Sequence, residues 1–201
     1  VLVFSSTKGA TAICAHLLAQ RGELDLDAPV AQYWPEFAAA GKKDIPVRWL
    51  LSHRVGLPVF DRPLTVEEYL SWDTAVSLLA AQRPMWEPGS TFGYHAGTYG
   101  WLVGEVVRRI SGKSLGTFFA DEVAKPLGLE FWIGLPEDKE DRVVPMRSIE
   151  LDDAGVDAQA TTPRRRLLLD AARDEDSYLS RPTTTEPLDM NTRAFHATEM
   201  P

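Results

Sequence analysis

A hydroxyl and an amine stand three positions apart near the amino terminus, in the run Ser5-Ser6-Thr7-Lys8-Gly9. Residues i and i+3 share one face of a helix, so the Lys8 amine can reach back to the Ser5 hydroxyl. A serine becomes a good nucleophile when a neighbouring base takes its proton, and burial can lower the pKa of a lysine until it is that base. The spacing therefore predicts covalent catalysis by Ser5 and Lys8. The alternative is that Ser5 only caps a solvated helix start.

The residues after this pair favour the catalytic interpretation. The stretch from Ala10 to Gln20 is typical of a helix that is apolar on nearly every side, and Arg21-Gly22 supplies a stop signal. A helix of this kind belongs in the middle of a domain. Its first turn then lies in a medium of low dielectric constant, where a lysine loses its proton most readily.

A second group of residues that could take part in catalysis runs from Trp86 to Gly100. Pro88-Gly89 predicts a turn, and the apolar spacing from Thr98 to Ile110 predicts a helix. Tyr94 stands in the loop between them, from which its phenol could reach a neighbouring helix start and relay protons beside a Ser-Lys pair. The alternative is a packed aromatic ring whose hydroxyl bonds to a main-chain carbonyl.

These segments occur in the order found in one known family. The matching segments are residues 5–9, 24–30, 33–35, 50–58, 88–94, 110–115 and 126–129. The run LLSHRVGLP at residues 50–58 resembles the family's leucine-rich signature, and Ser5 with Lys8 resembles its first motif. Over residues 1–145 the chain resembles the serine β-lactamase-like superfamily, in the branch of class C β-lactamases, D,D-peptidases and family VIII carboxylesterases.

This resemblance implies a fold and a set of roles. The fold is mainly α, namely the helical region of the α/β serine β-lactamase/transpeptidase-like fold with most of the β-sheet region missing. Residues 1–149 are expected to form the helical region, and residues 150–201 a loop-rich linker leading to the missing sheet. The resemblance also implies that Ser5 attacks a carbonyl, that Lys8 and Tyr94 share proton transfer, and that the Ser5 amide supplies half of an oxyanion hole.

The second motif departs from the family at its third position. Family β-lactamases have Tyr-x-Asn, whereas this chain has Ala96, whose side chain forms no hydrogen bond. The change suits the esterase branch. His95 and Trp86 are then candidate substrate-binding residues, Trp86 as part of an acyl pocket. The alternative for His95 is a loop histidine that points away from Tyr94.

The third motif of the family has no convincing counterpart. Trp132-Ile133-Gly134 matches its Trp-x-Gly variant as text, but it follows the helical region directly, where the family has no such strand. We therefore expect an internal fragment of a longer protein, with low activity on its own. Its nucleophile helix should then expose an apolar face at Ile13, Leu17 or Leu18.

The function predicted from these observations is a serine esterase that cleaves small acyl esters through an acyl-enzyme on Ser5. A β-lactamase or D,D-peptidase, acting on an amide, is the alternative with the same chemistry. A non-catalytic homologue that binds a ligand or forms a scaffold is the alternative from another class. Fluorophosphonate labelling separates an enzyme from a scaffold.

Composition excludes several other functions. The chain is 44% hydrophobic and 25% charged, as globular proteins are, and its net charge of −8 argues against nucleic acid and anionic membranes as partners. No apolar run is long enough for a membrane span, and the four histidines lack metal-ligand spacing, so neither a metal nor a cofactor is expected. Cys14 is expected to be a buried core residue. The compartment is not identified, although a cytoplasmic location is favoured, and the oligomeric state stays open.

Several further elements are expected from local signals. Residues 47–53, 65–72, 74–82 and 114–124 should form helices, the second beginning with a capping box made by Thr65 and Glu68. Residues 131–135 are expected to form a strand. The stretch from residue 150 onward, including the basic run at 164–166, is expected to be loop.

Overall fold

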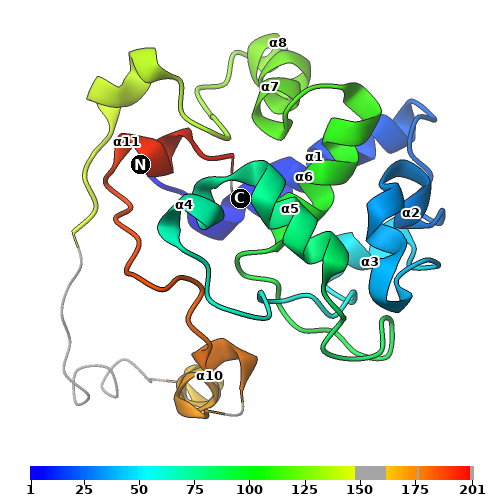
Figure 1. The fold of residues 1–201 in the computed structure, drawn as a ribbon. Coiled ribbons are helices and arrows are strands. Elements are labelled where there is room, and N and C mark those ends of the chain that lie inside the picture. The colour runs from blue at the N-terminus through cyan, green and yellow to red at the C-terminus, as the bar shows by residue number, and fades with distance from the viewer. Residues whose placement is uncertain (148–161, 176, 200–201) are drawn as a thin grey trace.

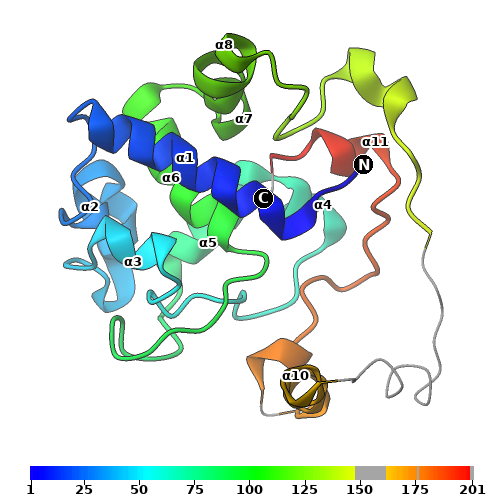
Figure 2. The same ribbon diagram turned by 180° about the vertical axis from the view of Figure 1, so that it is seen from behind.

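The computed structural model describes residues 1–147, 162–175 and 177–199, and these residues form helices joined by loops (Figures 1 and 2). The part of the chain that the structure describes has two isolated β-bridges, Pro29 to Pro46 and Leu64 to Thr184, and no strand. This mainly α architecture confirms the predicted fold class. The α-helices are α1 (Thr7–Gln20), α2 (Val30–Tyr33), α3 (Val47–Leu51), α4 (Val66–Leu70), α5 (Trp72–Ala81), α6 (Tyr99–Ser111), α7 (Leu115–Phe119), α8 (Lys125–Leu127), α10 (Pro163–Arg173) and α11 (Arg193–Ala197).

Shorter turns complete the helical structure. One π-helical turn, Ala120–Ala124, joins α7 to α8. The 3₁₀ turns are Phe4–Ser6, Pro35–Gly41, Glu137–Arg142 and Tyr178–Ser180.

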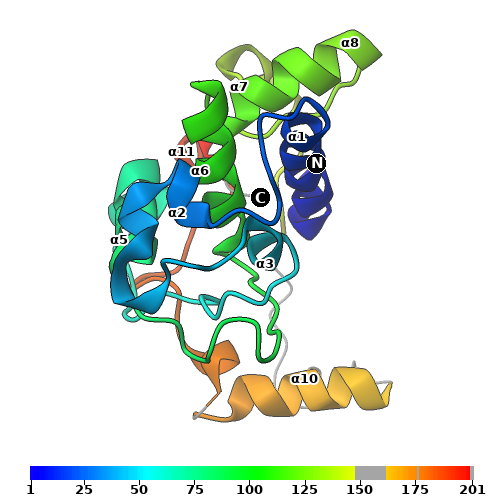
Figure 3. The same cartoon turned by 90° about the vertical axis from the view of Figure 1, so that its right-hand side faces the viewer.

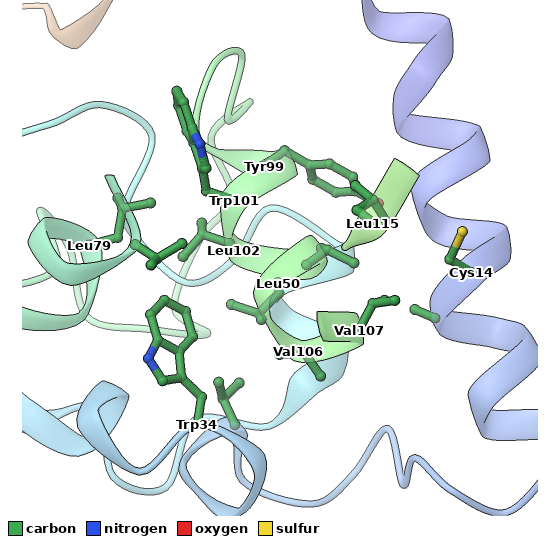
Figure 4. Close-up of a cluster of buried hydrophobic side chains, with 14 of the residues drawn as sticks. Cys14, Trp34, Leu50, Leu79, Tyr99, Trp101, Leu102, Val106, Val107 and Leu115 are labelled. Carbon is green, nitrogen blue, oxygen red and sulfur yellow. The ribbon is translucent and has the colours of Figure 1, made fainter. Parts of the chain in front are cut away.

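Helix α1 packs along α6, and Figure 3 shows the two helices in the body of the molecule while α10 lies apart from them. Small residues on α1, among them Ala10, Cys14 and Ala15, are buried and allow this close approach. The side of α1 that carries Cys14 is turned toward the valines of α6 (Figure 4). The burial of Cys14 confirms its expected place in the core.

One side of α1 is nevertheless open. Ile13 is 48% exposed, whereas Leu18 is fully buried. Ile13 shares its exposed face with Gly9, His16 and Gln20, as the helical repeat requires. The expectation of an uncovered apolar position on this helix is thus confirmed at Ile13.

Helix α6 is buried on almost every side, and its one buried carboxylate is fully hydrogen-bonded. Glu105 accepts from Trp72 Nε1 at 2.8 Å, from Arg108 Nε at 2.7 Å and from Arg109 Nε at 2.7 Å. A buried charge is costly unless it is paired in this way. These bonds hold the Glu105 pKa below its usual value although burial opposes them. The network fixes α6 against the start of α5.

The capping box at the start of α4 is confirmed. The Glu68 amide donates to Thr65 Oγ1 at 3.1 Å, and the Thr65 amide donates to Glu68 Oε2 at 2.9 Å. Other local expectations were wrong. Residues 131–135 form a bent loop rather than a strand, with Gly134 at a φ of +74°.

Two helices occur where a loop was expected. Thr162 caps α10 by accepting from the Arg165 amide at 3.2 Å, and Pro163 stands at its first position. Thr192 caps α11 in the same way, with the Phe195 amide as donor. Two main-chain hydrogen bonds of Leu64 join the segment between these helices to the body of the molecule. The Leu64 amide donates to the Thr183 carbonyl, and the Thr185 amide donates to the Leu64 carbonyl.

Among the described residues, no helix has both the length and the apolar character that a membrane crossing needs. The same residues include no group of three or more potential metal ligands.

Lys42 is fully buried, and its amine donates to the carbonyls of Ala39 at 2.9 Å and Gln82 at 2.6 Å. Burial lowers its pKa to about 8, with a smaller opposing effect from Asp61. Between about pH 8 and pH 10 the unfolded chain therefore binds a proton at Lys42 that the folded chain has lost. Stability conferred by this residue must rise with pH across that interval.

We expect the free energy of unfolding of the wild type, minus that of Lys42→Met, to increase from pH 8 to pH 10, by up to about 1.4 kcal/mol per pH unit. Urea unfolding at several pH values measures the difference. Lys43→Met, at an exposed neighbour, is the matched control, and the increase at Lys42 should exceed any change that this control gives over the same pH range. A difference that falls as the pH rises would contradict the sign of the pKa shift.

Candidate active site

The start of α1 brings a hydroxyl and an amine together. Ser5 lies in the 3₁₀ turn directly before α1, and Lys8 lies in the first turn of the helix. Lys8 Nζ donates to Ser5 Oγ at 3.4 Å and to the main-chain carbonyl of Ala96 at 2.7 Å. Phe4 precedes Ser5 with a φ of +45°, a strained backbone conformation for a residue with a side chain. Such strain is concentrated at functional sites.

Lys8 lies in surroundings that favour the neutral amine. Its side chain is buried, with 8% of the residue exposed. Burial lowers the Lys8 pKa, and interaction with the Tyr94 phenol raises it by a smaller amount. The amine lies 5.3 Å from the centroid of the Tyr94 ring and 5.8 Å from that of Tyr99. Lys8 is therefore suited to take a proton from Ser5.

Two loops hold Tyr94 beside this pair. The Gly93 amide donates to the carbonyl of His53 at 3.1 Å, and Thr98 Oγ1 donates to the carbonyl of Leu57 at 2.6 Å. The loop that follows α3 thus supports the loop that carries Tyr94. Tyr94 as a residue is 45% exposed.

His95 is fully buried between the same two loops. Its Nε2 accepts from the Leu57 amide at 3.0 Å, and its Nδ1 lies 2.6 Å from the carbonyl of Gly93, to which it donates. Burial lowers the His95 pKa to about 4, so the ring is neutral. Both ring nitrogens are used within the loops, and this placement does not support the expectation that His95 contacts the substrate. His95 is not among the residues that line the cavity at Ser5.

Trp86 packs under the Tyr94 loop rather than beside Ser5. Its ring meets His95 edge-on at 6.0 Å between centroids and lies 6.3 Å from the ring of Tyr178. A Cβ atom at Gly93 would lie 2.7 Å from the Trp86 ring, so this contact requires glycine there. Trp86 Nε1 is buried without a hydrogen-bond partner among the described residues. Trp86 supports the loop and does not line the cavity at Ser5.

A cavity of about 520 Å³ opens at Ser5 and Lys8. Ala96 and Gly97 line it beside the pair, and residues 130–135 and Phe195 line it farther along. The Trp132-Ile133-Gly134 run therefore forms part of the wall, although on a loop and not on the strand that the family's third motif requires. Most of the lining is apolar, as expected for a site that binds a small organic substrate.

Sequence reasoning missed four features of the site. The His53 ring contacts the Tyr94 ring, and the Tyr99 ring faces the Lys8 amine. The main-chain carbonyl of Ala96 accepts a hydrogen bond from Lys8. The carbonyl gives no signal in a sequence, because every residue has one. His53 stands in a recognised motif, but its neighbours across the loops depend on the tertiary fold. His196, whose Nδ1 lies 2.6 Å from Glu140 Oε1, also lines the cavity and had no local signal.

Comparison with known proteins gives a consistent result. A sequence model of the family described as Beta-lactamase matches residues 1–194. The esterase/beta-lactamase LipL of Mycobacterium tuberculosis is 38% identical over 169 residues, which are 83% of this chain and 38% of LipL. The crystal structure of a family VIII carboxylesterase has 41% identity and a TM-score of 0.71, over 86% of this chain and 47% of that one. A penicillin-binding protein homologue from Caulobacter crescentus has 33% identity and a TM-score of 0.71, over 97% of this chain and 50% of that one.

The chain thus spans 38% of LipL and about half of each of these two structures. Its helices match the helical portion of the β-lactamase/transpeptidase-like fold. Since the family model covers almost all of its length, this chain belongs to the beta-lactamase family.

Proposed function

We propose that this chain carries the nucleophile of a serine ester hydrolase that works through an acyl-enzyme on Ser5. The observation that supports it most is the buried Lys8 amine at 3.4 Å from Ser5 Oγ, with a lowered pKa. Ser5 Oγ attacks the ester carbonyl as its proton passes to Lys8. The ester bond then breaks, and the leaving alcohol takes a proton through Tyr94 and Lys8. Water attacks the acyl-enzyme by the same route and releases the acid.

Esters are favoured as substrates by the residue at position 96 and by the relatives. Lys8 bonds to the main chain of Ala96, where the lactamases of this family have an asparagine side chain. The names of LipL and of the family VIII carboxylesterase include esterase activity. The apolar cavity of about 520 Å³ suits a small acyl group.

Hydrolysis of a β-lactam or peptide amide is the second candidate, because LipL is also named a beta-lactamase and one structural relative is a penicillin-binding protein homologue. The comparison of p-nitrophenyl butyrate with nitrocefin, using protein expressed from the complete reading frame, separates the two. We expect faster turnover of the ester. Failure of a fluorophosphonate probe to label the protein would favour a non-catalytic homologue.

Tyr94→Phe should lower kcat for p-nitrophenyl butyrate by about 10²- to 10⁴-fold, because the variant keeps the ring and loses the proton-relaying hydroxyl. KM should change little, since the phenol acts on the leaving group and not on the bound acyl chain. Steady-state kinetics measure both. Tyr33→Phe is the matched control: its hydroxyl accepts from the Asp25 amide far from Ser5, and activity should be kept. A Tyr94→Phe variant with wild-type kcat would remove Tyr94 from the mechanism.

A further inference from the structure

We propose that His53 is a positioning residue for this reaction, which holds Tyr94 at the Ser5–Lys8 pair through both main-chain neighbours of Tyr94. The proposal rests on the proposed function. Neither His53 nor Tyr94 is among the residues that line the cavity at Ser5, but Tyr94 approaches the site at Lys8 Nζ, 5.3 Å from its ring centroid. His53 contacts Tyr94 ring to ring, at 4.9 Å between centroids, so its effect on the reaction passes through Tyr94.

Two hydrogen bonds from one residue bracket Tyr94. The Gly93 amide donates to the His53 carbonyl at 3.1 Å, and the His95 amide donates to His53 Nδ1 at 3.2 Å. The residues before and after Tyr94 are therefore fixed to the same point on the opposite loop. A rotation of the Tyr94 backbone would break one of the two bonds.

The ring of His53 also supports the ring of Tyr94. The centroids of the His53 and Tyr94 rings lie 4.9 Å apart in a tilted arrangement. The His53 and Tyr99 rings are also tilted, with 5.0 Å between their centroids. Both tyrosine rings also face Lys8 Nζ. His53 thus packs against both tyrosines that border the Lys8 amine. Removal of its ring would take away one of the contacts that hold the Tyr94 ring in place.

The state of the ring fits this role. Because Nδ1 accepts a main-chain bond, the proton of the neutral ring is on Nε2. Burial lowers the His53 pKa, and interaction with Lys8 lowers it to a smaller degree, which favours the neutral ring.

The backbone of His53 has a φ of +59°, a left-handed conformation that is unfavourable for a residue with a side chain. The structure maintains this strain at the residue that brackets Tyr94. Asparagine tolerates the same conformation, and its Oδ1 can accept a bond as Nδ1 does. Asparagine is therefore the conservative replacement here, and alanine is the disruptive one.

The test is a double-mutant cycle on protein expressed from the complete reading frame. Fluorophosphonate labelling counts the active sites, and kcat is calculated per labelled site so that misfolded protein does not lower it. His53→Ala should lower kcat for p-nitrophenyl butyrate by about 10- to 100-fold, the cost of a misplaced group, with KM nearly unchanged. His53→Asn should recover part of the loss. In a Tyr94→Phe background, His53→Ala should lower kcat by no more than about twofold, because the group it positions is already absent.

His16→Asn, on the exposed face of α1, is the matched control and should leave kcat unchanged. Equal losses from the His53 change in both backgrounds would overturn the proposal, and so would wild-type kcat in His53→Ala. If His53→Ala does not fold, the same cycle with His53→Asn decides. Ser5→Ala in the same assay reports on the proposed function separately. Full activity there overturns the Ser5 mechanism, whereas an inactive Ser5→Ala with independent His53 and Tyr94 effects overturns only the role of His53.

Discussion

Ser5→Ala is expected to abolish fluorophosphonate labelling and to lower kcat for p-nitrophenyl butyrate by about 10⁴- to 10⁶-fold. The acyl group has no oxygen to bond to in this variant, and the proton acceptor at 3.4 Å has nothing to activate. The groups of a nucleophile–base unit act together, so loss of the nucleophile removes nearly the whole effect.

Ser6→Ala is the matched control for this change. Ser6 is the exposed neighbour of Ser5 in the same turn, but it lies outside the i, i+3 pair with Lys8. Labelling and turnover should be kept in it. Labelling of Ser5→Ala at the wild-type rate would show that the nucleophile lies elsewhere.

Lys8→Arg should lower kcat/KM almost as much as the loss of the nucleophile, by about 10³-fold or more. Arginine keeps the positive charge and the donors of lysine but does not release its proton at any working pH. Lysine can do so here because burial lowers its pKa from 10.5. The amine must be neutral to accept the Ser5 proton, so wild-type kcat/KM should rise with pH as Lys8 deprotonates, with the midpoint below 10.5.

The pH–rate profile and Lys43→Arg complete this experiment. Lys43 is exposed, so the same exchange there should leave both the rate and the profile unchanged. Wild-type kcat/KM in Lys8→Arg would exclude Lys8 as the base.

The sequence was most informative where structure depends on neighbours along the chain. The i, i+3 spacing of Ser5 and Lys8 is a property of any helix, and the capping box of α4 needs only Thr65 and Glu68. The start of α10 carried a comparable signal in Thr162-Pro163, which the low apolar density around it obscured. The bent loop at 131–135 has the composition of a strand, but a strand needs a neighbouring strand to pair with, and the described residues form none; the Leu135 amide bonds to the carbonyl of His196 in α11 instead.

The details of the site depend on contacts across the fold, which single-sequence reasoning does not reach. His95 stands next to Tyr94, but the direction of its ring is set by the amide of Leu57 on another loop. The same holds for His53, whose partners Gly93 and His95 lie about forty positions farther along the chain.

The hydrogen bond from Lys8 to the Ala96 carbonyl affects which substitutions this site can accept during evolution. A contact made through a side chain is lost when that residue mutates, whereas a main-chain acceptor is present whatever residue occupies the position. Ala96 is also exposed at the edge of the cavity. Position 96 can therefore accumulate substitutions that reshape the entrance for new substrates while the base keeps its anchor, which makes it a natural starting point for directed evolution.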